Sequence, residues 1–193
     1  MTTLSIKDRI QFVHEGGAVV RFHQHIGHVL DTDARHSHGV AVLCYFLTDG
    51  APSVNLLMAA LSHDLAEQVV GDIPYTAKRN IPGLKATCAA MEQEVLSKYG
   101  LAFTLTEAEQ RTLRLADALD GMLYCCHEAA LGNHTALRRV YTKWLEGLRA
   151  GASTYSDVER SIVRAVERIW DESNDPQGPQ YTLSTECNCT ISE

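Results

Sequence analysis

The sequence predicts a single all-α domain. Apolar residues recur at helical spacing in most of the chain, whereas the alternating pattern of a half-buried strand is nearly absent. A chain of 193 residues is long enough to form one domain with a sizeable core. The predicted helices cover about 4–15, 36–49, 53–70, 84–99, 106–132, 135–150 and 156–172.

Several of these segments begin at a residue that suits a helix N-terminus. Ser53 precedes the apolar run "VNLLMAALSH", and two later segments start with a Ser or Thr followed three positions on by Glu, which is capping-box spacing. Those pairs are Thr106 with Glu109 and Ser156 with Glu159. Prolines fall between segments, where a missing N–H is best tolerated: Pro52, Pro74 and Pro82.

The far C-terminus has a different composition. The tail "ESNDPQGPQYTLSTECNCTISE" is polar and rich in Pro, Gly and Ser. We therefore expect a folded domain over 1–175 and a mobile tail over 176–193.

Composition and charge exclude several classes of function. A net charge of −7 argues against a nucleic-acid polymer as the main partner. No apolar run reaches the length that spans a membrane, and we interpret the N-terminus as part of the fold because it lacks a signal-peptide pattern. The six cysteines form no CxxC motif, so we expect reduced thiols in a cytoplasm, which would be the host cytoplasm for a viral protein.

The stretch "ALSHDLAEQVVGD" places titratable residues where an apolar helix is expected. His63 and Glu67 are one helical turn apart, with Asp64 beside them. An imidazole next to carboxylates is a compact set of ligands for a divalent ion, which would compensate their burial. An HD pair alone is more often part of a solvated, ion-paired helix end.

Two other segments supply matching residues. His36 opens a helix in "DTDARHSHGVAVLCYFL", and Asp117 lies on the apolar face of "RTLRLADALDGMLYCCHEAALGN". Together with His63 and Asp64 they would give two nitrogens and two carboxylates from three helices. Asp120, one turn beyond Asp117, is expected to hydrogen-bond a ligand rather than to act as one.

This arrangement resembles the HD-domain metal-dependent phosphohydrolases, whose pattern is H…HD…D on an all-α fold. The resemblance is closest to the bacterial 5′-deoxyribonucleotidase branch and the related bacteriophage dATP triphosphohydrolases. It is carried by three blocks that cover about two-thirds of the chain in the family's order, namely 19–41, 61–79 and 113–133. The middle block, with its HD pair, its Glu and "GDIP", is the most specific.

The resemblance implies a role for each matching residue. It implies that His36, His63, Asp64 and Asp117 bind a divalent transition metal, which would be Co, Mn, Zn or Fe. Glu67 would help to activate or orient the attacking water, and Asp72 of "GDIP" would give a proton to the leaving oxygen. Arg21 and Lys78 would bind phosphate.

Two positions depart from the family's pattern. Phe22 stands where the 5′-deoxyribonucleotidases have a Trp that excludes a 2′-hydroxyl, so an aromatic face is kept. Arg35 stands where an acidic residue usually precedes the first ligand His, and a cation there would meet additional phosphates. We therefore count Phe22 and Arg35 with Arg21 and Lys78 as candidate substrate-binding residues.

The expected function is hydrolysis of deoxynucleoside 5′-monophosphates, or of triphosphates such as dATP, by a metal-activated water. The resemblance also favours a homo-oligomer, dimer or higher. An alarmone or cyclic-nucleotide hydrolase uses the same H…HD…D pattern, but alarmone hydrolases carry two successive acids where this chain has Glu67 followed by Gln68. A non-catalytic HD module that binds metal or a partner is the remaining alternative.

Overall fold

The computed structural model describes residues 4–175, and within them every regular element is a helix. The all-α prediction is confirmed; the one β-type pairing in this range is an isolated bridge between Val20 and Thr32. The helices are α1 (Ile6–Gly16), α2 (Asp33–Leu47), α3 (Val54–Ser62), α4 (Glu67–Val70), α5 (Tyr75–Asn80), α6 (Leu84–Tyr99), α7 (Glu107–Ala130), α8 (Arg138–Gly151) and α9 (Asp157–Asn174), with a 3₁₀ turn η1 (Ala152–Thr154).

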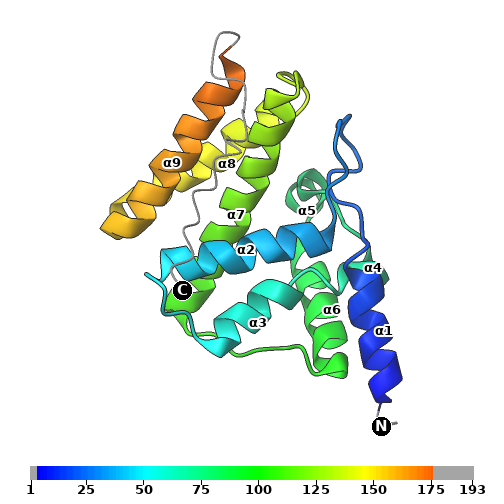
Figure 1. The fold of residues 1–193 in the computed structure, drawn as a ribbon. Coiled ribbons are helices and arrows are strands. Elements are labelled where there is room, and N and C mark those ends of the chain that lie inside the picture. The colour runs from blue at the N-terminus through cyan, green and yellow to red at the C-terminus, as the bar shows by residue number, and fades with distance from the viewer. Residues whose placement is uncertain (1–3, 176–193) are drawn as a thin grey trace, which may run out of the picture.

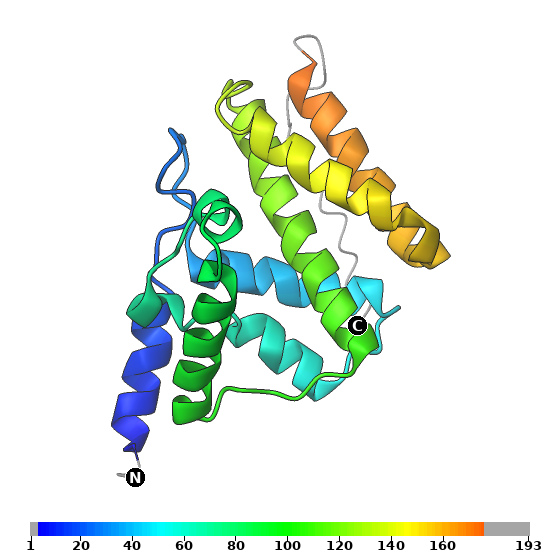
Figure 2. The same cartoon turned by 180° about the vertical axis from the view of Figure 1, so that it is seen from behind.

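Helix α7 is the centre of the fold. It packs against α2, α3, α8 and α9, with α8 and α9 on one side and α1 and α6 on the other (Figures 1 and 2). The α7 residues Leu119 and Met122 are fully buried and belong to one apolar cluster with Val40 of α2 and Leu56 of α3. This packing holds α2, α3 and α7 together, and these are the helices predicted to carry the site.

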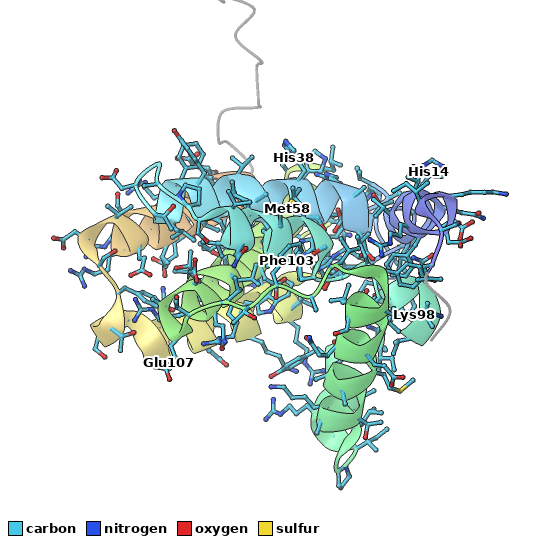
Figure 3. The ribbon with its side chains drawn as sticks, turned by 90° about the horizontal axis from the view of Figure 1, so that it is seen from below. His14, His38, Met58, Lys98, Phe103 and Glu107 are labelled. Atoms are coloured by element: carbon cyan, nitrogen blue, oxygen red, sulfur yellow. The ribbon has the colours of Figure 1, made fainter. Side chains whose placement is uncertain are left out.

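A smaller apolar cluster joins α1 and α6 to the segment after α3. Its buried members are Phe12, Leu65, Ala66 and Leu96, and the Phe12 ring stacks on Tyr99 with 3.7 Å between ring centroids. Seen from below, the chain leaves α6 past Lys98 and runs through Phe103 to the start of α7 at Glu107 (Figure 3). The segment that carries the HD pair is therefore packed against both clusters.

The predicted caps are present. The Ser53 hydroxyl accepts a hydrogen bond from the Leu56 N–H, and both predicted capping boxes, Thr106 with Glu109 and Ser156 with Glu159, form completely. A third capping box, Ser5 with Asp8, starts α1. Local sequence thus determines where these helices begin.

The continuous helix expected over 53–70 is wrong. α3 ends at Ser62, residues 63–66 form a turn, and α4 starts at Glu67. Backbone bonds from Leu65 N to Ser62 O and from Glu67 N to Asp64 O span three residues, which is the tighter 3₁₀ pattern. The short helix α5 was not expected, because six residues carry little helical periodicity.

Some sequence predictions concern residues outside the described range. The tail over 176–193, which the sequence predicts to be mobile, lies there, as do Cys187 and Cys189. The four cysteines within residues 4–175 are free and buried: Cys44, Cys88, Cys125 and Cys126. Over the same range, no helix is long and apolar enough to cross a membrane.

Candidate metal centre

The structure brings the two predicted histidine ligands and the Asp of the HD pair together. His36, His63 and Asp64 each place one ligand atom within 4.8 Å of the others. Asp64 lies between the rings, with Oδ2 3.5 Å from His36 Nε2 and Oδ1 3.4 Å from His63 Nε2. The α2 helix and the turn after α3 therefore present three ligand atoms to one point.

Asp117 of α7 contacts His36 but is not within reach of the whole group. Its Oδ1 lies 3.1 Å from His36 Nε2, and its side chain is 47% exposed. It is not among the three residues whose ligand atoms all lie within 4.8 Å of one another. Asp117 is therefore the most accessible of the four predicted ligands.

Hydrogen bonds at the far nitrogens orient both imidazoles. His36 Nδ1 lies 2.6 Å from Asp120 Oδ2, and His63 Nδ1 lies 2.9 Å from the Ala60 carbonyl oxygen. Both contacts require Nδ1 to donate, which leaves Nε2 with a free lone pair. Both Nε2 atoms are buried without a hydrogen-bond partner and face carboxylate oxygens. A cation between them would satisfy all these groups, so the residues fit a divalent metal.

Asp120 is placed as the sequence indicated. Its hydrogen bond to His36 makes it the outer partner of a predicted ligand. Gly39 of α2 leaves room for it, since a Cβ at that position would lie 1.9 Å from Asp120 Oδ1. His38, by contrast, is exposed on the opposite side of α2.

Sequence reasoning missed Asp33. This residue is fully buried, and neither of its carboxylate oxygens has a hydrogen-bond partner. Asp33, Asp64 and Glu67 form a second group with one ligand atom each within 4.8 Å of the others. The available signal was its spacing, because Asp33 precedes His36 by three residues and so shares its face of α2.

Arg21 compensates this concentration of carboxylates. Its guanidinium contacts Asp64, and it lies 3.5 Å from Asp31 and 3.8 Å from Asp33. Burial opposes the charge of Arg21, but the surrounding acids, Asp64 foremost, raise its pKa. The predicted phosphate-binding arginine is thus held directly beside the metal-ligand candidates.

Without a cation, the centre favours bound protons. Burial raises the pKa of Glu67, and the charges of Asp64 and Asp72 raise it further. Burial also raises the pKa of Asp33 to about 7, again with Asp64 adding to the effect. Burial alone would lower the pKa of His36, yet its contacts with Asp117 and Asp120 raise it to about 9.

The other predicted site residues lie around this centre. Asp72, in the segment between α4 and α5, lies with Oδ2 3.3 Å from His23 Nδ1. Lys78 of α5 is 3.2 Å from Glu92 Oε1 on α6. Arg35 is 3.5 Å from Asp31, so it belongs to the margin rather than to the ligand group.

Phe22 belongs to an aromatic cluster that the sequence analysis did not predict. Its ring stacks on Tyr124 at 4.6 Å between centroids and meets the Trp144 ring edge-on at 6.0 Å. The Arg35 guanidinium lies 5.9 Å from the centre of the Tyr124 ring. Gly121 admits the Trp144 indole, because a Cβ there would lie 2.2 Å from it.

One face of α7 organises the whole region. From Asp117 it continues at turn spacing through Asp120, Gly121 and Tyr124 to Glu128. The buried Glu128 carboxylate accepts hydrogen bonds of 2.8 Å from the backbone N–H groups of His28 and Val29. The same helix therefore carries a predicted metal ligand, one ring of the aromatic cluster and the carboxylate that anchors the loop after Phe22.

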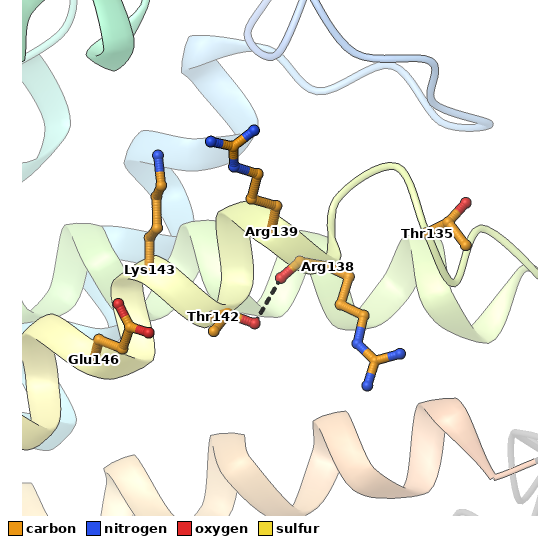
Figure 4. A pocket seen from close by; sticks show the side chains of 6 residues that line it. All are labelled: Thr135, Arg138, Arg139, Thr142, Lys143 and Glu146. Atoms are coloured by element: carbon orange, nitrogen blue, oxygen red, sulfur yellow. Dashed lines mark hydrogen bonds between the residues drawn. The ribbon is translucent and has the colours of Figure 1, made fainter. Parts of the chain in front are cut away.

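The surface hollow along α8 is separate from this centre. It has a volume of about 500 Å³ and is lined by Thr135, Arg138, Arg139, Thr142, Lys143 and Glu146. Arg139 and Lys143 point to one side of α8 and Arg138 to the other (Figure 4). None of the predicted site residues lines this hollow, so it is not the candidate centre.

Comparison with known proteins agrees with this arrangement. One similar structure is that of the cyanophage S-2L HD phosphohydrolase DatZ, solved with dA and one catalytic Zn²⁺ ion. Its sequence is 19% identical and its TM-score is 0.65, over 89% of this chain and 99% of the DatZ chain. An HD-domain phosphohydrolase from Listeria innocua is 18% identical with a TM-score of 0.67, over 88% and 90% of the two chains. These likenesses show the HD-domain fold.

The sequence comparisons identify the family. No curated protein matches the chain by sequence. The family model described as "5'-deoxynucleotidase YfbR-like" matches residues 11–169, which include every residue of the candidate centre. The chain therefore belongs to the YfbR-like 5′-deoxynucleotidase family of HD-domain phosphohydrolases.

Proposed function

We propose that this protein is a divalent-metal-dependent hydrolase of deoxynucleotides. The observation that carries the proposal is the pair of buried imidazoles, His36 and His63. In each of them Nδ1 is engaged and the free Nε2 faces the Asp64 carboxylate. A bound cation would compensate these buried groups, and a metal-assisted hydrolysis needs such an ion.

His36, His63, Asp64 and Asp117 would hold the ion, with Co, Mn, Zn and Fe as candidates for this mixed set of donors. When bound, the ion polarises a phosphoryl oxygen and lowers the pKa of a water ligand. The half-exposed Asp117 lies on the side open to substrate. Asp120 keeps His36 in the tautomer that binds metal.

Glu67 is proposed to take the proton from the attacking water. Its carboxylate lies with those of Asp33 and Asp64, and the burial that raises its pKa makes it a stronger base than an exposed glutamate. Asp33, which the sequence analysis did not identify, would place a third carboxylate beside Glu67 and Asp64, and its charge helps to raise the pKa of Glu67. Asp72, whose charge also acts on Glu67, is assigned to proton delivery to the leaving oxygen.

Arg21 and Lys78 are proposed to bind the phosphate. Arg21 already lies against Asp64, so a phosphate oxygen at the ion would come within reach of its guanidinium. Phe22, stacked on Tyr124, would face the sugar or base, and Arg35 at its edge would meet further phosphates of a triphosphate. A deoxynucleoside at this position is supported by the dA bound to DatZ, a protein of the same fold.

The alarmone alternative receives no support from the position after Glu67. Gln68 does not point into an acidic pair there; its amide donates a 2.6 Å hydrogen bond to the Phe12 carbonyl oxygen and so ties α4 to α1. That residue has a structural role in this chain.

We also propose that the protein is a homo-oligomer, dimer or higher, in the cytoplasm. Light scattering would test the oligomer, and cell fractionation would test the localisation.

The test is turnover of a complete set of nucleotides. Purified protein is incubated with Mn²⁺ or Co²⁺ and each deoxy- and ribonucleoside mono- and triphosphate, with Asp64→Ala as the inactive control. Turnover of deoxynucleoside monophosphates across bases would define a 5′-deoxynucleotidase. Turnover of one triphosphate such as dATP would define a triphosphohydrolase. Absence of turnover, or equal turnover by Asp64→Ala, would overturn the proposal.

A further inference from the structure

His23 is the one histidine of the segment "RFHQHIGHV" that contacts a predicted catalytic residue. Its Nδ1 lies 3.3 Å from Asp72 Oδ2, and its side chain is 47% exposed while that of Asp72 is 22% exposed. The contact joins two segments far apart in the chain, the loop after Arg21 and the connection between α4 and α5. Both segments also border the centre, because Arg21 contacts Asp64 and the charge of Asp72 acts on Glu67.

The residue before His23 has an unusual backbone conformation. Phe22 has a φ of +53°, in the left-handed region that residues other than glycine rarely adopt. The chain therefore reverses at Phe22, which places its ring against Tyr124, Arg21 against Asp64 and His23 against Asp72. Strain retained at one residue between two polar contacts points to a function for both contacts.

The proposed reaction has a need that this pair can meet. When the bond from phosphorus to the 5′-oxygen breaks, the leaving oxygen takes the electron pair and would depart as a strongly basic alkoxide unless it is protonated. A carboxyl group is a poor store of protons at neutral pH, whereas an imidazole changes its charge near that pH. A carboxylate that holds one ring nitrogen orients the imidazole and stabilises its protonated form.

We propose that His23 is the general acid for the leaving 5′-oxygen and that Asp72 positions it. Asp72 holds Nδ1, so Nε2 is the nitrogen that gives its proton to the leaving oxygen as the phosphorus–oxygen bond breaks. The attacking water forms the new phosphorus–oxygen bond and loses a proton to Glu67. Glu67 then gives a proton to solvent and His23 takes one up, so protons and electrons balance over one turnover. This inference rests on the proposed function and replaces direct proton donation by Asp72 with donation by His23, a residue that the comparison with the family did not mark.

The experiment compares two leaving atoms on one nucleotide. The substrates are the deoxynucleotide that the wild type hydrolyses best and the same compound with sulfur in place of the bridging 5′-oxygen. A thiolate is a far weaker base than an alkoxide and leaves without a proton. His23→Gln should therefore lose about 100-fold in kcat on the oxygen substrate and about threefold or less on the sulfur substrate, each relative to wild type.

His25→Gln is the matched control. His25 lies in the same loop, but the ion pair with Asp72 is made by His23. The backbone N–H of His25 donates a hydrogen bond to the Phe22 carbonyl oxygen, and a change of side chain keeps this bond. His25→Gln should change neither rate by more than about threefold. Asp72→Asn should repeat the selective loss of His23→Gln, and the double variant should lose no more than the worse single variant, because the two residues act as one unit.

The outcomes separate this inference from the proposed function. If His23→Gln lowers kcat equally on the oxygen and sulfur substrates, the acid role is overturned and His23 is a loop anchor. Wild-type rates of His23→Gln on both substrates would also overturn the acid role. If the wild type hydrolyses no nucleotide while metal binding is intact, the proposed function has failed first, and the inference fails with it. Circular dichroism and melting temperature confirm that each variant is folded before its rates are compared.

Discussion

Replacement of Asp120 tests whether the hydrogen bond behind His36 matters for metal binding. Asp120→Ala removes the 2.6 Å contact to His36 Nδ1 and leaves that nitrogen without its acceptor in a fully buried ring. Loss of such an outer partner typically costs 10- to 100-fold in metal affinity, or about 1.4–2.7 kcal/mol. We expect a loss near the upper end, because the bond is short and joins a carboxylate that is only 17% exposed.

Asp120→Asn gives a graded result. The amide oxygen still accepts the Nδ1–H, but the negative charge is lost, so we expect a loss near 10-fold. Affinity is measured by titrating Co²⁺ or Mn²⁺ against a competing fluorescent chelator, with metal-free protein checked by circular dichroism. Asp171→Ala, an exposed aspartate of α9, is the matched control. Wild-type affinity in Asp120→Ala would show that His36 is not held by this bond, or is not a ligand.

Three further changes test other parts of the centre. Glu67→Gln should lower kcat by about 100-fold or more with the metal still bound, as measured by steady-state kinetics and metal analysis of the same sample. An unchanged kcat would mean that Glu67 has a purely structural role. Below pH about 9 the metal must replace a proton on His36, so metal affinity should fall by about tenfold per pH unit for each proton displaced as the pH drops. A metal affinity that does not change between pH 6 and 8 in the chelator titration would contradict this expectation. Glu128→Ala should lower the free energy of unfolding by about 2–4 kcal/mol, since two loop N–H groups lose the buried carboxylate that accepts their hydrogen bonds. An unchanged midpoint in denaturant curves would refute this, and Glu128→Gln is the milder variant.

The fold and the broad chemistry were predictable because their signals are local. Capping boxes such as Thr106 with Glu109 need only four residues, and the structure forms them as expected. The family match over residues 11–169 confirms the resemblance drawn from the HD motif. The bond from Asp120 to His36 also follows from helical spacing, once α2 and α7 are placed side by side.

The errors arose where tertiary contacts override local pattern. The apolar run over 53–70 looks like one helix, but the chain tightens at 63–66, where His63 and Asp64 turn toward α2 and Leu65 and Ala66 enter the second apolar cluster. Asp33 was missed because a lone acid in the first turn of a helix normally caps it or faces solvent. Only the packing of α2 shows that this acid is fully buried beside Asp64.

The sequence by itself determined the helical class, the helix starts and the residue types able to bind a cation, because each depends on neighbours within a turn or two. The tertiary structure alone decided which of those residues meet. It placed Trp144 of α8 over Gly121 and against Phe22, and it joined His23 to Asp72 across the chain. Such contacts depend on how whole helices pack and on the left-handed backbone at Phe22, and no periodicity along the chain records either.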